Sequence, residues 1–408
     1  MKIKPLLLLL TLASAALSSC KPEVPEGPDL TKLDFQQFIG HTEDLGFSMR
    51  KLMTTLPNDE IVVTYTSFVP GTGTNGVQDI RLTKYDIKGT QVWDKMIVTG
   101  FVNFPMDLKL TSDGQFIIAG IRAVDDQYLE RSLAYLAKTS PDGTLLWEKT
   151  FGTDEQGSAL SVTEGTDGNY YLLCIQQKTN KLYVVVVSPA GTQLGQWSFS
   201  EAPYNNSIRY GSVSRIAATR DSHILIFGAS VHKLTLSGDV VWSKNRVTYD
   251  NPDEYVYLYS MLQNAAGTYV FAGESVNTGS VNFDRAAAFV TINPDSSLEI
   301  NKRLSFPGFE DALCSDIYEQ APNDYFLTGT VSDIDYNRYV LLVNVTGLGV
   351  EKWSKTFDYS NGVSMKANYG GGGARLSNGS YVFQGITERR EDTPSQWRRT
   401  LLVKWGKP

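Results

Sequence analysis

The residues that most often carry catalysis are scarce in this sequence. Its 408 residues include 3 histidines and 3 cysteines, so histidine acid–base chemistry, cysteine nucleophiles and His/Cys metal sites have few possible members. No Gly-x-Ser-x-Gly motif marks a serine nucleophile. Carboxylates could still act, because a pair of them cleaves glycosidic bonds through geometry and needs no motif. The possible members are Glu155, Glu254, Asp311 and Asp316.

Three other patterns invite a chemical interpretation, and each is incomplete. Asp333, Asp335 and Asn337 begin like a calcium loop, but Arg338 occupies the position of the required glycine. The glycines at 370–373 are not followed by the Gly-Lys-Ser/Thr of a phosphate loop. His223 and His232 are expected on neighbouring strands, too far apart to share a metal. We therefore predict no catalytic residue, no metal and no cofactor from sequence motifs.

The chain past residue 40 repeats one pattern of four strands. In the clearest copy, residues 108–152, two Asp-Gly turns at 111–114 and 140–143 each join a pair of apolar or alternating strands. Gly120 marks the expected end of the second strand, and Trp147 lies near the start of the fourth. The second-strand anchors recur about 53 residues apart, at Tyr65, Gly120, Cys174, Gly228, Gly273, Gly329 and Gly385.

Seven such units predict an all-β fold, a seven-bladed β-propeller of four-stranded antiparallel blades. The last unit ends at Pro408 before a fourth strand, and residues 33–39 have the matching pattern of an aromatic residue followed by Gly40. We therefore predict that this N-terminal strand completes the seventh blade and closes the ring. Closure removes the free sheet edges that promote aggregation. The repeats resemble those of kelch, quinoprotein and related envelope propellers, which implies a fold and no particular activity.

The N-terminus has the pattern of a processed signal. Lys2 and Lys4 precede an apolar run that is too short to span a bilayer. Leu17, Ser18, Ser19 and Cys20 resemble a bacterial lipobox, which implies cleavage before Cys20 and acylation of its sulfur. We predict a signal peptide at 1–19, a Pro-rich tether at 20–30, and one propeller domain at 31–408. The expected location is the outer membrane, on a side that the sequence leaves open.

The two faces of such a propeller differ in this sequence. The turns between first and second and between third and fourth strands are short, and we call their side the turn face. The second-to-third loops and the inter-blade connections are long and varied, and we call their side the loop face. Variable loops on a rigid scaffold usually carry recognition, so we predict the binding residues there: Tyr128, Arg131, Tyr204, Arg209, Tyr249, Tyr255, Tyr336, Arg338, Trp397 and Arg398.

These observations lead to two functional hypotheses. A formal net charge of −7 argues against a nucleic-acid partner. Aromatic, amide and arginine side chains suit protein or glycan ligands. The first hypothesis is a lipid-anchored, monomeric, non-enzymatic binding or scaffolding module for a protein or glycan. The alternative is a glycoside hydrolase or lyase that uses acidic residues in the central funnel.

Overall fold

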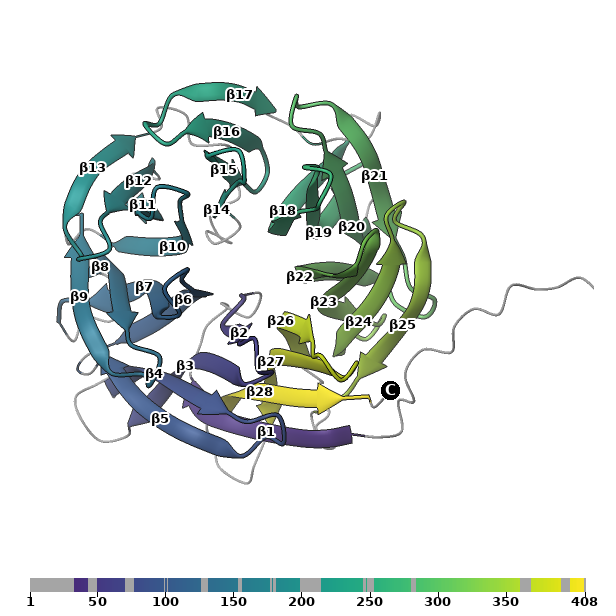
Figure 1. Ribbon diagram of the computed structural model, residues 1–408. Coiled ribbons are helices and arrows are strands. Elements are labelled where there is room, and N and C mark those ends of the chain that lie inside the picture. Colours follow the sequence, from purple (N-terminus) through teal and green to yellow (C-terminus); the bar gives the residue numbers. More distant parts are fainter. Residues whose placement is uncertain are drawn as a thin grey trace, which may run out of the picture.

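The protein is a closed ring of seven four-stranded sheets, as Figure 1 shows. The computed structural model describes residues 33–42, 50–69, 77–98, 100, 102–125, 131–152, 156–176, 178, 181–198, 214–244, 247, 253–279, 284–359, 368–389 and 397–406. All elements in these ranges are β-strands, in antiparallel blades. The described residues include no helix that is long and apolar enough to cross a membrane. The prediction of a seven-bladed, all-β propeller is confirmed.

Each blade runs from its innermost to its outermost strand in chain order. Blade 1 is β2 (Met53–Thr55), β3 (Ile61–Val69), β4 (Val77–Tyr85) and β5 (Gln91–Val98). Blade 2 is β6 (Asn103–Leu110), β7 (Phe116–Ala123), β8 (Ser132–Thr139) and β9 (Leu145–Phe151). Blade 3 is β10 (Gly157–Glu164), β11 (Tyr170–Gln176), β12 (Lys181–Val187) and β13 (Gln193–Ser198). Blade 4 is β14 (Arg215–Ala218), β15 (His223–Phe227), β16 (Val231–Thr235) and β17 (Val240–Lys244).

The second half of the ring continues this order until the last strand. Blade 5 is β18 (Glu254–Gln263), β19 (Tyr269–Asn277), β20 (Asp284–Ile292) and β21 (Leu298–Leu304). Blade 6 is β22 (Asp311–Ala321), β23 (Asp324–Ser332), β24 (Arg338–Thr346) and β25 (Glu351–Phe357). Blade 7 takes β26 (Asn368–Arg375), β27 (Tyr381–Arg389) and β28 (Trp397–Trp405) from the C-terminus, and β1 (Leu33–Thr42) from the N-terminus.

Strand β1 closes the ring in the predicted way. It pairs antiparallel with β28, from Leu33 opposite Trp405 to Thr42 opposite Arg398, and Figure 1 shows it on the outside of blade 7. Phe35 lies against Gly89 of blade 1, where an added Cβ would be 2.5 Å from its ring. The Nζ of Lys404 donates a hydrogen bond to the Ile87 carbonyl at 2.9 Å. Strand β1 therefore completes blade 7 by pairing with β28, and the contacts of Phe35 and Lys404 fasten blade 7 to blade 1.

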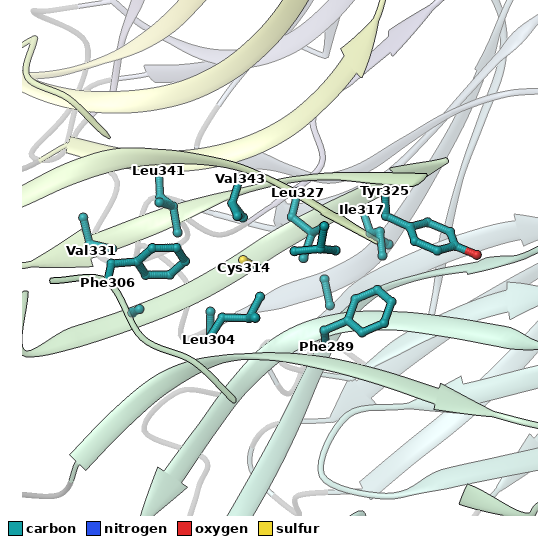
Figure 2. Packing of buried hydrophobic residues seen from close by; sticks show 14 of the residues in the cluster. Phe289, Leu304, Phe306, Cys314, Ile317, Tyr325, Leu327, Val331, Leu341 and Val343 are labelled. Carbon is teal, nitrogen blue, oxygen red and sulfur yellow. The ribbon is translucent and has the colours of Figure 1, made fainter. Parts of the chain in front are cut away.

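The Trp anchors pack between blades. Trp147 of blade 2 packs against Tyr170 of blade 3, with ring centroids 6.3 Å apart, and its Nε1 donates to the Pro189 carbonyl at 3.0 Å. Trp242 makes the equivalent contacts one blade pair later, with Tyr269 and with the Pro294 carbonyl. Below these outer contacts the blades share apolar cores. Figure 2 shows one of them, between blades 5 and 6, built around Phe289, Cys314 and Leu341.

Six of the seven second-strand anchors lie inside their strands and not at the ends, which corrects the prediction, whereas Gly228 follows directly after the end of β15. Strands β7, β19 and β23 continue past Gly120, Gly273 and Gly329. In blades 2, 3, 5, 6 and 7 the anchor pairs with the inner-strand residue just before a β-bulge. At most of these anchors, the inner-strand carbonyl oxygen lies so close that any residue larger than glycine would force the backbone to move. An added Cβ on Gly273 would be 1.8 Å from the Tyr257 oxygen.

The glycine run at 370–373 lies in β26, the innermost strand of blade 7. A Cβ on Gly370 would be 2.1 Å from the Gly329 carbonyl oxygen of blade 6, and one on Gly371 would be 2.7 Å from the Arg50 oxygen of blade 1. The inner strand is therefore squeezed from both neighbouring blades. The two later cysteines, Cys174 and Cys314, are buried and free.

Replacing Gly329 by Ala should strongly destabilise the ring. Its added Cβ would lie 1.9 Å from the Leu313 carbonyl oxygen, and overpacking of this kind costs about 3 kcal/mol. We expect a fall in melting temperature of roughly 5 °C or more by calorimetry. Gly195→Ala is the matched control, because no atom lies within 4 Å of its added Cβ. Equal melting temperatures for the two variants would contradict the role given to the anchor.

Candidate active site on the loop face

The structure describes six of the ten residues predicted for the binding face. Tyr128, Tyr204, Arg209 and Tyr249 lie outside the described residues. The strand order places the remaining six, Arg131, Tyr255, Tyr336, Arg338, Trp397 and Arg398, toward the loop face of blades 2, 5, 6 and 7. They are spread around the ring and do not form one constellation.

Two of them belong to local structures of the loops. The Nη1 of Arg131 binds the Asp125 carboxylate at 2.8 Å across the β7–β8 connection. Tyr336 is 70% exposed with a φ of 61°, at the tip of the turn between β23 and β24. In that turn Asp333 Oδ1 accepts hydrogen bonds from the Asp335 and Asn337 backbone amides at 3.0 Å each. The calcium-like pattern thus forms a turn held by its first carboxylate.

The other four lie in strands. Trp397 and Arg398 open β28, opposite Arg389 and Glu388 of β27, so these two residues predicted for a loop belong to a strand. Tyr255 is the second residue of β18, and Arg338 is the first of β24. The pairing partner in the next strand extends the sheet even where the sequence lacks strand alternation, because pairing satisfies the backbone groups.

Two of the four predicted carboxylates have structural contacts. Glu254 accepts a hydrogen bond from Ser275 and forms an ion pair with Arg303 at 2.8 Å. Arg303 also binds Asp284 at 2.8 Å. Asp316, which is 1% exposed, accepts Ser260 Oγ at 2.6 Å and pairs with Lys51 Nζ at 3.0 Å. It also accepts the Gly373 amide at 3.1 Å, so it joins the inner strands of blades 5, 6 and 7 to the segment before the inner strand of blade 1.

Glu155, the third carboxylate, lies outside the described residues. Asp311, the fourth, is the first residue of β22. Within the described part of the chain its carboxylate makes no hydrogen bond and no ion pair shorter than 4 Å. It is half-buried, between the charges of Arg285 in blade 5 and Arg338 in blade 6. Of the four predicted carboxylates, Asp311 is therefore the one described residue that has no hydrogen-bond or ion-pair partner among the described residues.

A second carboxyl group lies close to Asp311 on the neighbouring blade. Glu274 follows the anchor Gly273 in β19, on the strand side that faces blade 6, like Ala272 of the shared core. Its Oε1 accepts a hydrogen bond from the buried Tyr259 hydroxyl at 2.5 Å. Its Oε2 lies 3.9 Å from the Arg285 Nη1, at the limit of an ion pair. The Glu274 side chain retains an exposed fraction of 10%.

Arg338 extends this row of charges toward blade 7. Its Nη1 donates a hydrogen bond to the Tyr369 hydroxyl at 2.6 Å, and its guanidinium lies 5.1 Å from the centre of the Tyr369 ring. Arg338 and Asp311 both pair with Ser332, so they lie on either side of Ser332, in β24 and β22, at the loop-face end of blade 6. We call the following residues the carboxylate–arginine cluster: Tyr259, Glu274, Arg285, Asp311, Arg338 and Tyr369.

Both carboxyl groups of the cluster hold their protons more tightly than usual. Burial raises the pKa of Glu274, against the lowering effects of the Tyr259 hydrogen bond and the Arg285 charge, and the Asp311 charge raises it further. Burial also raises the pKa of Asp311, although Arg285 and Arg338 lower it. Two raised carboxyl pKa values at one surface site are typical of acid–base chemistry.

The sequence contained one overlooked signal for this cluster. The residues after the seven anchors are Thr66, Ile121, Ile175, Ala229, Glu274, Thr330 and Ile386. Glu274 is the one charged residue among them, at a position that faces the neighbouring blade. The partners Tyr259, Arg285 and Tyr369 come from separate strands, and no local spacing links them.

No group of three or more His, Cys, Asp or Glu side chains among the described residues could hold a metal ion. His232 pairs with Ile226 in the ladder, and its ring contacts Ser230 and Ser243 at 2.8 and 2.9 Å. His223 lies near Asp221 at 3.4 Å. His232 and His223 therefore have separate hydroxyl and carboxylate partners.

Comparison with known proteins supports the propeller fold and corrects one functional prediction. No protein-family model and no curated protein matches the chain. Among solved structures, an ulvan lyase from a new family of polysaccharide lyases, bound to -[GlcA(1-4)Rha3S]-, is similar with a TM-score of 0.57 and 10% identity, over 89% of this chain and 95% of its own. A protein of unknown function from Bacteroides caccae has a TM-score of 0.43 and 12% identity, over 72% of this chain and 94% of its own.

A puromycin hydrolase variant has a TM-score of 0.46 and 9% identity, over 86% of this chain and 61% of its own. The ulvan lyase, with its TM-score of 0.57, shows that this fold includes enzymes, and this finding corrects the prediction of a non-enzymatic protein. That prediction relied on the lack of a catalytic motif. A propeller can draw its catalytic groups from strands of several blades, so a short motif is not required.

Proposed function

We propose that the protein is a carbohydrate-active enzyme that cleaves a glycan chain at the carboxylate–arginine cluster. The observation that carries this proposal is the placement of Glu274 and Asp311 on adjacent blades, with Arg285 3.9 Å from Glu274 and Arg338 across Ser332 from Asp311. The fold shared with the ulvan lyase supports a glycan as the substrate class. The protein acts as a monomer, since one ring contains the whole cluster.

The two carboxyl groups have different surroundings and take different roles. Glu274 is the more buried, and its protonated form donates the proton that the leaving sugar oxygen needs as the glycosidic C–O bond breaks. Asp311 is more exposed, and the charges of Arg285 and Arg338 limit the rise in its pKa that burial causes. It accepts a proton, either from the water that adds to the sugar in hydrolysis or from the sugar carbon in elimination.

Incubating the purified protein with a panel of polysaccharides tests this proposal. Cleavage by either route creates new chain ends, which lower the viscosity of the solution. Hydrolysis yields new reducing ends alone, whereas elimination also yields an unsaturated sugar that absorbs in the ultraviolet. The proposal fails if envelope and algal polysaccharides, neutral and acidic, all keep their chain length.

We also propose that the mature chain is an outer-membrane lipoprotein attached through Cys20. The lipobox-like residues and the Pro-rich segment support this assignment. Strand β1 begins at Leu33, opposite the end of β28, and third strands end at the turn face. A lipid on Cys20 would then join the turn face, and the loop face with the cluster would point away from the bilayer, toward its substrate.

Replacing Cys20 by Ser should release the protein from membranes. The acyl chains supply the binding energy, about 0.8 kcal/mol per buried methylene, and a serine cannot carry them in thioether linkage. We expect the wild type in the membrane pellet and the variant in the soluble fraction after ultracentrifugation. Cys174→Ser, at a buried core position, is the control that should stay in the pellet. A variant that pellets with the wild type would contradict the anchor.

A further inference from the structure

Two arginines of the cluster have guanidinium groups that the protein uses only in part. Among the described residues, Arg338 makes one side-chain hydrogen bond, to the Tyr369 hydroxyl at 2.6 Å. The nearest acid to Arg285 is Glu274, at 3.9 Å, and the Arg285 side chain is 40% exposed. Most of their N–H donors therefore have no hydrogen-bond acceptor in the described part of the chain.

A third arginine on the same face shows the difference. Arg303 binds Glu254 and Asp284 at 2.8 Å each, so two carboxylates satisfy its guanidinium. Arg122 of blade 2 is likewise paired, with Glu148 at 2.9 Å, and it lies over the Tyr135 ring. Arg285 and Arg338 thus differ from arginines with structural ion pairs elsewhere on this ring.

The position of Arg338 is fixed before any ligand binds. Tyr369 holds it by a hydrogen bond and by its ring face, with the guanidinium 5.1 Å from the ring centre. A planar guanidinium held in one orientation presents a pair of parallel donors, which match the two oxygens of a carboxylate or a sulfate. The loss of side-chain entropy on binding is correspondingly smaller.

We infer that Arg285 and Arg338 bind anionic groups of the glycan, so that the substrate is an acidic polysaccharide. This inference rests on the proposed function, because it takes the same site as the point of cleavage. The two arginines flank Asp311 from blade 5 and blade 6. One anionic sugar would contact Arg338, and Arg285 would hold a neighbouring anionic group along the chain. Carboxylate and sulfate substituents share this chemistry.

Calorimetric titration with three polymers separates the possible ligands. The full chain carrying Glu274→Gln, which slows cleavage, is titrated with polygalacturonate, dextran sulfate and neutral dextran. We expect binding of at least one acidic polymer, with a dissociation constant that rises with salt, and no binding of dextran. The acidic polymer that binds identifies carboxylate or sulfate as the recognised group. Dextran binding as tight as acidic binding, or no acidic binding, would overturn the inference.

A substitution then assigns the binding to the arginines. Arg338→Gln should weaken acidic-polymer binding about 30-fold, the worth of charge-assisted hydrogen bonds. Arg122→Gln on blade 2 is the matched control and should bind like its parent. Equal affinity in both variants would overturn the inference. Acidic binding that depends on Arg338, without cleavage by the wild type, would support the inference and refute the proposed function. Cleavage of neutral chains alone would support the proposed function and refute the inference.

Discussion

Glycan cleavage by the Glu274→Gln variant is expected to fall about 10³-fold, within the usual range for loss of a general acid. Gln keeps the shape of the side chain and can still accept the Tyr259 hydrogen bond, but it cannot donate a proton to the leaving oxygen. Asp311→Asn should cause a comparable loss, because the amide is not a base. Both effects should fall on kcat, measured from initial rates of chain-end formation.

The stability of Glu274→Gln distinguishes lost chemistry from lost folding. Burial raises the pKa of Glu274 in the folded state, so the folding stability that this group contributes is present at low pH and is lost as the pH rises through that folded pKa. The Gln variant has no charge to bury, and at pH 8 it should melt no lower than the wild type. A much lower melting temperature would contradict the account of burial.

Glu148→Gln is the matched control for the rate measurement. Glu148 lies on blade 2, where it pairs with Arg122 at 2.9 Å and accepts the Tyr135 hydroxyl at 2.9 Å. It thus has an arginine and a tyrosine partner like Glu274, in another part of the ring. Its variant should cleave at the wild-type rate. Equal losses in both variants would show that the cluster on blades 5 and 6 has no special role.

Deleting residues 31–42 should lower the melting temperature by about 10 °C or more. The deletion removes all of β1, including its ladder with β28 and the Gln37 hydrogen bond to the Gly89 carbonyl at 2.9 Å. It also leaves β28 as an unpaired edge strand, which favours association between copies. Calorimetry and size-exclusion chromatography measure the two effects.

Deleting residues 21–30 provides the control for this experiment. This segment precedes β1 in the chain and is predicted to be a Pro-rich tether, so its removal should leave the melting temperature unchanged. Phe35→Ala should give an intermediate fall, since it keeps the ladder and removes only the ring packed on Gly89. An unchanged melting temperature after the 31–42 deletion would contradict closure by β1.

Much of the fold could be predicted because each blade repeats the same solution. The Asp-Gly turns and the Trp anchors recur, and the missing fourth strand of blade 7 has its counterpart in residues 33–39. The anchor glycines were predicted at the ends of their strands, but most lie inside them. Their position depends on a bulge in the paired inner strand, such as the one in β22 opposite Gly329. A single strand pattern does not show where its partner bulges.

The candidate site was harder to predict because it breaks the repeat. Asp311 was among the expected carboxylates, and Arg338 was among the expected binding residues. Glu274 lies within an apolar strand, and its relation to Asp311 depends on how blades 5 and 6 pack together. Tyr369 comes next to the glycine run of β26, where the sequence drew attention to backbone packing. Contacts between blades therefore created the site.

The most direct measurement is a crystal structure of the Glu274→Gln variant with a bound substrate oligosaccharide. The account predicts density for a sugar chain on the loop face at blades 5 and 6, with a glycosidic oxygen next to position 274. It also predicts Asp311 on the other side of the cleaved bond and an anionic substituent on Arg338. A chain bound at the turn face, or on the loop face of other blades away from this cluster, would contradict it.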